Sequence, residues 1–179
     1  MRHSSTAPDL LAQYAESHRD QRNISTHFVS VPLIVLGVGI LLARARFDLG
    51  GREFSAAWLA YGACALWYLS RRGAFSLNLA VTAALGLLTA VAHPISQGSV
   101  AGWLVCGVGS FLFGWAVQFL GHYYEGKAPS CAEDGTALLV GPMFVTAEAL
   151  FALGWNKPLM AEIERRAGPT YLRDLAHPA

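Results

Sequence analysis

The sequence has little charge. Of its 179 residues, 14% are Asp, Glu, Lys or Arg and 54% are hydrophobic, whereas about 25% of a typical soluble domain is charged. Residues 73–124 form a run of 52 without one residue of these four types. A surface facing water could not be built from such a run, and a buried helical bundle in water would need polar faces that the segments lack. An ordinary soluble domain is therefore disfavoured.

Other features are absent as well. The net charge is only +1 and no stripe of lysine and arginine with interleaved aromatics appears, so no nucleic-acid partner is expected. The opening residues, MRHSSTAPDLLAQY, have no apolar core beside the initiator methionine, which argues against a cleaved signal peptide. Cys64 and Cys106 lie in apolar runs and Cys131 in an expected loop. Three scattered cysteines indicate neither a disulfide framework nor a zinc knuckle.

Five apolar segments organise the chain. Each is near the roughly 17 to 25 residues that cross a bilayer as a helix, and none alternates as a membrane strand would. They fall at about residues 28–43, 54–70, 74–92, 100–120 and 137–154. We expect an all-α integral membrane bundle of four to five hydrophobic helices with an N-terminal amphipathic helix. The whole chain, 1–179, is predicted to be one membrane domain, with an N-terminal segment (1–27), the bundle (28–154) and a polar tail (155–179).

The N-terminal segment predicts an amphipathic helix over residues 9–23. Tyr14 and His18 lie on its apolar face. Residues 23–26 include Asn, Ser and Thr, which are weak helix formers that cap well, so we expect a break there. If the first apolar segment starts only at Pro32, its dozen residues rise about 18 Å, less than the roughly 30 Å hydrocarbon core. This segment is then expected to be kinked or only partly inserted.

Two histidines flank the expected break. His18 and His27 are nine residues apart, which is about 900° around a straight helix and puts them on opposite faces, with about 13.5 Å of rise. A break lets the chain fold back, so that both could bind one ion while Asn23 orients an imidazole through a hydrogen bond. The alternative is that His18 ends the amphipathic face and His27 anchors the chain at the membrane interface.

Polar side chains also interrupt the later apolar segments. Gln118, His122 and Glu125 form one stripe at i, i+4 and i+7. Ionisable groups near membrane spans are costly and usually face a cavity or a partner. Glu148 is the only charge in the last apolar segment, and it is either near the site or a protonated carboxyl bonded to a neighbouring helix. Asn78 joins the candidates, although it could simply hold helices together.

Counting membrane crossings groups the histidines. An even number of crossings separates the N-terminal segment from the end of the fourth apolar segment. His18, His27 and His122 are therefore expected on one face of the membrane, and His93, after three crossings, on the other. The basic residues divide almost equally between the two sides, so they do not predict the orientation.

Several ordered motifs resemble a known family. YAESHRDQRNISTHFVSVP is similar to a Y-x3-H-x4-N-x3-H-x4-P opening, and QFLGHYYEGKAP and GPMFVTAEALFALG are similar to later Q-F-x-G-H and P-x-F-x3-E-x-L-F signatures. Together with LNLA around Asn78, they resemble the Mpo-type 2-hydroxy fatty acid dioxygenases, which act in converting phytosphingosine to odd-chain fatty acids. The resemblance runs from Tyr14 to Gly154.

The resemblance implies a ligand set. It makes His18, His27 and His122 the expected Fe(II) ligands. It places further residues in or around the catalytic site, namely Asn23, Gln118, Glu125 and Glu148. Glu125 follows His122 by three residues, where the family usually has four. Ser130 and Cys131 also follow Pro129 where the family favours Pro-Ala.

The resemblance further implies a substrate and a reaction. A long-chain 2-hydroxy fatty acid would be shortened by one carbon with O₂ and loss of CO₂, without 2-oxoglutarate. Tyr14, Arg22 and Asn78 are expected to contact the substrate. Candidates for binding its carboxylate are Arg22, Arg71, Arg72 and Lys127. The protein would lie in the lipid bilayer, in the endoplasmic reticulum if eukaryotic and in the cytoplasmic membrane if bacterial.

Two other functions remain open from the sequence. One is a non-catalytic membrane protein that binds lipid or organises partners and whose histidines are interfacial anchors. The other is a zinc membrane hydrolase, because imidazole suits zinc and iron alike. No H-E-x-x-H motif supports the hydrolase. Metal analysis of the purified protein discriminates among the three.

Overall fold

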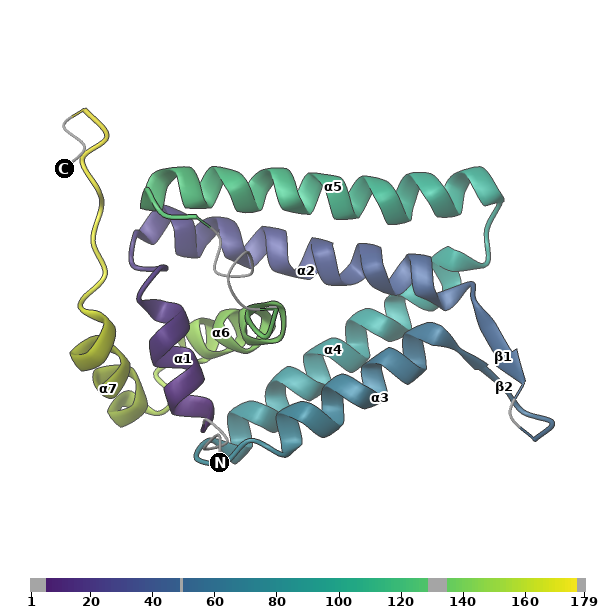
Figure 1. The fold of residues 1–179 in the computed structure, drawn as a ribbon, viewed down its shortest axis with the longest axis horizontal. Coiled ribbons are helices and arrows are strands. Elements are labelled where there is room, and N and C mark those ends of the chain that lie inside the picture. The colour runs from purple at the N-terminus through teal and green to yellow at the C-terminus, as the bar shows by residue number, and fades with distance from the viewer. Residues whose placement is uncertain (1–5, 49, 129–134, 177–179) are drawn as a thin grey trace.

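The fold is a bundle of helices with one small hairpin (Figure 1). The computed structural model describes residues 6–48, 50–128 and 135–176. In chain order the elements are α1 (Ala7–Ala15), α2 (Gln21–Ala43), β1 (Arg46–Asp48), β2 (Glu53–Ser55), α3 (Ala56–Leu69), α4 (Phe75–Ser96), α5 (Val100–Glu125), α6 (Ala137–Ala152) and α7 (Lys157–Ala167). The expected all-α helical bundle is confirmed. Cys131 lies outside the described residues.

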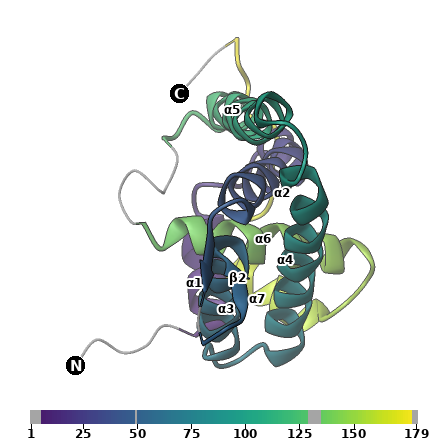
Figure 2. The same ribbon diagram turned by 90° about the vertical axis from the view of Figure 1, so that its right-hand side faces the viewer.

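Helices α2 and α5 form the central pair and lie side by side in opposite directions (Figures 1 and 2). Three glycines of α5, Gly107, Gly114 and Gly121, recur every seven residues and face α2. A Cβ atom built on Gly114 would lie 3.0 Å from the carbonyl oxygen of Ser30. Glycine at this spacing therefore lets the two backbones approach closely, as in many membrane helix pairs.

The break in the N-terminal segment lies earlier than predicted. Helix α1 ends at Ala15, and α2 begins at Gln21 and continues through residues 23–26 and Pro32. The predicted helix over 9–23 and the predicted break at 23–26 are therefore wrong. Asp20 caps α2 instead, because its carboxylate accepts the backbone N–H of Arg22 at 2.9 Å. At 23 residues, α2 rises about 35 Å, enough to cross a bilayer.

Within the described residues, three helices are long and apolar enough to cross a membrane, α2, α4 and α5. Helices α3 and α6 are apolar but have only 14 and 16 residues, fewer than the predicted spans. Figures 1 and 2 show α6 lying across the direction of α2 rather than along it. On α5, the side chains of Val105, Leu112 and Phe113 are 60% exposed or more. Such an apolar outer surface fits a membrane protein.

The two ends of α4 are held in different ways. Near its start, the Asn78 amide donates to the carbonyl of Arg71 at 2.8 Å and so closes the turn between α3 and α4. Near its end, Ala92 lies against Gly39 in the last turns of α2. The connection between α2 and α3 is the antiparallel hairpin of β1 and β2, in which Phe47 pairs with Phe54.

The C-terminal part of the chain returns to the start of α2. Helix α7 packs against α1 and buries Leu159 and Ile163. The segment after it, residues 170–176, is here called the C-terminal strap, and Figure 1 shows it in yellow, passing the start of α2. Its Tyr171 N–H donates to the carbonyl of Arg19 at 2.9 Å, and its Tyr171 carbonyl accepts the N–H of Gln21 at 3.0 Å. Residues 155–176 of the predicted polar tail are therefore built into the fold.

Candidate metal centre

Three histidines from distant parts of the chain converge at one end of the α2–α5 pair. His18 lies in the turn between α1 and α2, His27 in the second turn of α2 and His122 in the last turn of α5. Each offers one ring nitrogen, and these nitrogens lie within 4.8 Å of one another. All three side chains are buried. Metal–imidazole bonds of about 2.1 Å hold ligand nitrogens roughly 3 to 3.5 Å apart, so small ring movements would bring all three onto one ion.

Backbone carbonyls fix the orientation of two of these rings. His18 Nδ1 lies 2.7 Å from the carbonyl oxygen of Tyr14, and His27 Nδ1 lies 2.8 Å from that of Asn23. A carbonyl can only accept, so each Nδ1 carries the proton and each Nε2 keeps its lone pair. Metal-binding histidines commonly make this bond to a carbonyl. Both rings are therefore set to present Nε2 to the shared space.

Three other imidazole nitrogens of these histidines lack a hydrogen-bond partner among the described residues. His18 Nε2 and both nitrogens of His122 are buried without a hydrogen bond to any of the described residues. A buried polar atom without a partner costs about 1–3 kcal/mol. Burial, and then repulsion by a charged His27, lower the pKa of His18 well below 6.5 although its bond to Tyr14 acts in the opposite direction. His18 is thus neutral at pH 7, and the donor set fits a metal such as iron or zinc.

The side chain of Gln118 contacts the Nε2 lone pair of His27. The hydroxyl of Ser30 donates to Gln118 Oε1, which leaves the amide Nε2 facing His27 Nε2 at 2.7 Å. The amide therefore donates to His27. Gln118 also lines an apolar cavity next to the histidines, so its amide can turn to another acceptor when His27 binds an ion.

Glu125 holds the turn that carries His18. Its carboxylate accepts the backbone N–H groups of Arg19 at 3.0 Å and Asp20 at 2.8 Å, and the amide of Asn23 at 3.0 Å. The hydroxyl of Tyr171 donates to the same carboxylate at 3.2 Å. Because its carboxylate already accepts hydrogen bonds from these four groups, Glu125 holds the turn in place. It is not one of the three clustered side chains that could bind a metal. Asn23 joins it in this role.

Two arginines next to His18 are bound within the fold. The Arg19 guanidinium, buried, reaches Glu148 at 3.5 Å and the carbonyl of Ala15 at 3.1 Å, so Glu148 lies against Arg19 and not among the histidines. Arg22 forms an ion pair with Asp20 at 2.7 Å. Burial would raise the pKa of Asp20, but hydrogen bonds from the Arg22 side chain and from the N–H groups of Arg173 and Arg22 lower it to about 2.

The other predicted residues lie at varying distances from the histidines. The Tyr14 ring stacks on His18, with 4.0 Å between ring centroids. Lys127 donates to the carbonyl of Glu16 at 2.7 Å. Asn78 is occupied in the α3–α4 turn with Arg71. The carbonyl of Arg72 in that turn accepts the N–H of Ala7 at 2.9 Å, and His93 is in the last turn of α4 near the far end of α2.

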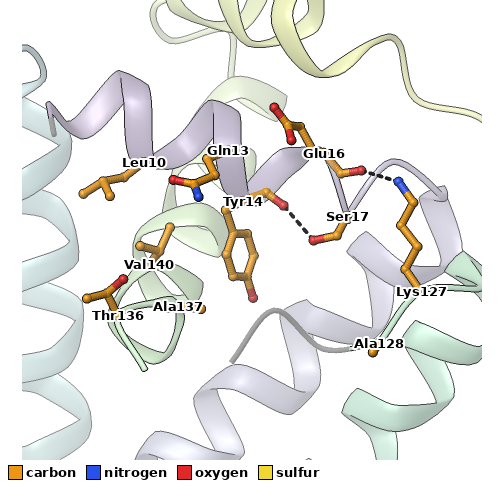
Figure 3. Close-up of a pocket in the computed structure, with 10 residues that line it drawn as sticks. All are labelled: Leu10, Gln13, Tyr14, Glu16, Ser17, Lys127, Ala128, Thr136, Ala137 and Val140. Atoms are coloured by element: carbon orange, nitrogen blue, oxygen red, sulfur yellow. Dashed lines mark hydrogen bonds between the residues drawn. The ribbon is translucent and has the colours of Figure 1, made fainter. Parts of the chain in front are cut away.

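Cavities lie on both sides of His122. A narrow cavity of about 50 Å³ between α2, α5 and α6 is lined by His122, Gln118 and apolar side chains that include Ile34 and Trp115. A second, of about 460 Å³, lies between the end of α5 and the C-terminal strap. Figure 3 shows a third cavity of about 460 Å³ beside α1, lined by Tyr14 and Lys127 but by none of the three histidines. Two cavities therefore share His122, one apolar and one whose lining also includes the cations Lys127 and Arg173.

Comparison with known protein families identifies the chain. Residues 4–153 match the Mpo1-like family, whose description is 2-hydroxy-palmitic acid dioxygenase Mpo1-like. The chain belongs to the Mpo1-like family. No curated protein and no solved structure matches it. All three histidines lie within the matched residues of this Mpo1-like chain, and the family description indicates a dioxygenase that acts on a fatty acid.

Sequence reasoning missed the C-terminal contribution to the Mpo1-like site. Tyr171 and Arg173 lie beyond residue 153, where the family match ends. Both contact the α1–α2 turn, because the N–H of Tyr171 donates to the carbonyl of Arg19 and the N–H of Arg173 donates to Asp20 at 2.9 Å. The Tyr171 hydroxyl also donates to Glu125 at the end of α5. No pattern within residues 155–179 marks them. The role of Asp20 as a cap could have been found, since Asp is a preferred residue before a helix.

Proposed function

We propose that this chain is an Fe(II)-dependent dioxygenase that shortens long-chain 2-hydroxy fatty acids by one carbon with release of CO₂. The observation that carries the proposal is the cluster of His18, His27 and His122, buried at the end of an apolar bundle in a chain of the Mpo1-like family. The unpartnered Nε2 of His18 and the partnerless ring of His122 are suited to hold the iron, and His27 Nε2 joins them once the Gln118 amide is displaced. Iron held by few protein ligands would supply redox chemistry with O₂ and leave positions open for the substrate.

The stoichiometry requires no second reductant. A 2-hydroxy acid and O₂ give a one-carbon-shorter acid, CO₂ and water, and atoms balance on both sides. The C1–C2 bond breaks, C1 leaves as CO₂, and C2 becomes the new carboxyl carbon. Oxidation of C2 and C1 releases the four electrons that reduce O₂. The proposal therefore includes no 2-oxoglutarate.

The protein residues have separate tasks in this proposal. Three imidazoles hold the metal, and Glu125 and Asn23 fix the turn that presents His18. Gln118, once displaced from His27, donates its amide to an oxygen of the substrate. The first carbons of the acyl chain lie in the narrow apolar space lined by Ile34 and Trp115, which also excludes water from the reacting carbons, and the rest of the chain extends beyond it. We place the protein in the endoplasmic reticulum membrane if eukaryotic and in the cytoplasmic membrane if bacterial.

The test is conversion by the purified, iron-loaded chain. With Fe(II) and ¹⁸O₂ but without 2-oxoglutarate, 2-hydroxypalmitate should give labelled pentadecanoate by mass spectrometry. Palmitate should not react, because it lacks the hydroxyl, and zinc should inhibit because it has no redox chemistry. Alanine at His18, His27 or His122 should abolish iron retention while the helical content by circular dichroism is kept. An iron-loaded, folded sample without any oxygen-dependent product would overturn the proposal in favour of a lipid-binding protein.

A further inference from the structure

The larger cavity at His122 has a distinct chemical character. Its lining combines His122 with the apolar side chains of Phe119, Tyr123 and Leu175 and the cations Lys127 and Arg173. Among the described residues that line it, none is acidic. Two cations in one cavity create a positive potential that attracts an anion. Its position next to His122 places that anion beside the candidate metal centre.

The backbone of Arg173 is held firmly in place. Its N–H donates to Asp20 Oδ2 at 2.9 Å, and its carbonyl accepts Arg22 Nη2 at 2.7 Å. The neighbouring Tyr171 bonds by its backbone to both sides of the same turn. Only residues 168 and 169 separate the strap from α7, and these bonds tie it to the start of α2. Arg173 therefore has a fixed starting point from which its side chain enters the cavity.

The guanidinium of Arg173 lies against the end of α5. A Cβ atom built on Gly126 would come within 2.9 Å of Arg173 Nη2, so a side chain at this position would displace the guanidinium. Gly126 also has φ +73°, which favours glycine for a second reason. Arg173 is half-buried, and within residues 6–48, 50–128 and 135–176 its guanidinium has neither a hydrogen bond nor an ion pair. The guanidinium groups of Arg19 and Arg22, by contrast, are both bonded.

We propose that Arg173 binds the carboxylate of the fatty acid in this cavity, with its acyl chain extending past His122 to the apolar space at Ile34 and Trp115. This inference rests on the proposed function for the identity of the substrate. A planar guanidinium matches a carboxylate through two parallel hydrogen bonds. Lys127 adds charge, but its ammonium already donates to the carbonyl of Glu16. Arg173 thus determines specificity for an acid over an alcohol or an ester.

Binding of a non-reacting acid tests this inference separately from catalysis. Palmitate and hexadecanol share one chain length and differ in charge, and both lack the 2-hydroxyl group. Quenching of tryptophan fluorescence in the full-length, detergent-solubilised chain gives their affinities, since Trp115 lines the apolar cavity. The wild type should prefer palmitate, and Arg173→Gln should lose roughly ten- to a hundred-fold in palmitate affinity with little change for hexadecanol. Arg173→Lys should recover part of the preference.

The control variant is Arg165→Gln. Arg165 lies on α7 with a side chain 71% exposed and pairs only with Glu162 among the described residues, so its loss should leave both affinities unchanged. Iron content and helical signal of Arg173→Gln should equal those of the wild type. If the variant does not fold, wild type and Arg173→Lys are compared with palmitate and methyl palmitate, and equal affinity for acid and ester overturns the inference.

The outcomes separate the two proposals. Unchanged palmitate affinity in a folded Arg173→Gln variant overturns the role of Arg173 even if 2-hydroxypalmitate is converted by the wild type. Loss of palmitate preference in the variant supports the carboxylate site even if no oxygen-dependent product is found. If conversion occurs, Arg173→Gln should raise the KM for 2-hydroxypalmitate by about the same factor as it weakens palmitate binding. The change in kcat should be smaller.

Discussion

Glu125 is the residue on which the geometry around His18 depends most. Glu125 is only 3% exposed, and its carboxylate accepts hydrogen bonds from the backbone of Arg19 and Asp20, from Asn23 and from Tyr171. These N–H groups belong to a turn and have no helical partner. A buried carboxylate in such surroundings is stabilised by charge-assisted hydrogen bonds, and the donors are costly to leave unpaired.

We therefore expect Glu125→Gln to weaken metal binding although Glu125 is not among the three histidines. The NH₂ group of the glutamine would point at the N–H groups that the Glu125 carboxylate now accepts. The free energy of unfolding should therefore fall by about 2 kcal/mol. Iron affinity should fall at least ten-fold because the turn no longer fixes His18. Iron titration and thermal unfolding measure both effects. Glu53→Gln, on the exposed hairpin, should change neither quantity; iron affinity that is equal in the two variants would contradict a positioning role for Glu125.

At the same scale, Tyr171→Phe removes one hydroxyl and nothing else. Tyr171 O–H donates to Glu125, so its loss should lower the free energy of unfolding by about 1 kcal/mol. Iron should still bind, since the backbone bonds of Tyr171 to the turn are kept. Tyr123→Phe is the matched control, because its side chain is 66% exposed. Equal thermal stability of the two variants would show that the strap hydroxyl does not support Glu125.

At the scale of elements, the site is formed where two closely packed helices end. Gly121 precedes His122 on α5 and faces α2, where a Cβ atom would collide with Thr26 and Asn23. Asn23 in turn provides the carbonyl that orients His27. The close approach of α2 and α5 therefore sets the separation of His27 and His122, so packing and metal geometry are coupled.

Gly121→Ala should separate the helices at the site. The extra methyl should cost about 1–3 kcal/mol in unfolding free energy and lower iron affinity, because overpacking moves the α2 side chains. Gly109→Ala, on the same helix, meets no atom within 4 Å and should be neutral or slightly stabilising. Thermal unfolding and iron titration of both variants provide the measurement. Equal iron affinity for Gly121→Ala and Gly109→Ala would refute the coupling.

For the whole molecule, the distribution of histidines between the two ends of the bundle decides which of them binds metal. His18, His27 and His122 lie at one end, and His93 lies near the other, in the last turn of α4. The strap and α7 close the end that holds the three histidines, and the β1–β2 hairpin lies at the opposite end in Figure 1. The three clustered histidines and the β1–β2 hairpin thus lie at opposite ends of α2.

Metal removal should destabilise the entire chain. An ion that binds only the folded state at 100 times its Kd adds about 2.7 kcal/mol, so chelation should lower Tm by several degrees and re-addition of Fe(II) should restore it. His93→Gln should keep both the iron content and this response. His122→Ala should lose them, because it removes one of the clustered nitrogens. A response to chelation that survives His122→Ala but is absent in His93→Gln would mean that the site lies at the other end.

Several features of the protein were determined by the sequence alone. Long apolar runs and the charge-free stretch of residues 73–124 predict membrane helices, because hydropathy and span length are local properties. The stripe of Gln118, His122 and Glu125 follows from helical spacing. The polar motifs also carried the family resemblance, which the match over residues 4–153 confirms. Helix lengths were less predictable, since α3 and α6 are shorter than their apolar runs.

Only the tertiary structure decided where the chain breaks and what surrounds the histidines. The polar residues at 23–26 remain helical because Asn23 bonds to Glu125 and Thr26 to the carbonyl of Asn23, so local propensity was overridden. The turn forms instead at residues 16–20, where Glu125, 105 residues after Asp20, accepts its N–H groups. Arg173 reaches the cavity in the same way, through bonds to a turn 153 residues earlier. Such long-range partners follow from the packing of α2 against α5 and of the strap against α2, which no local pattern encodes.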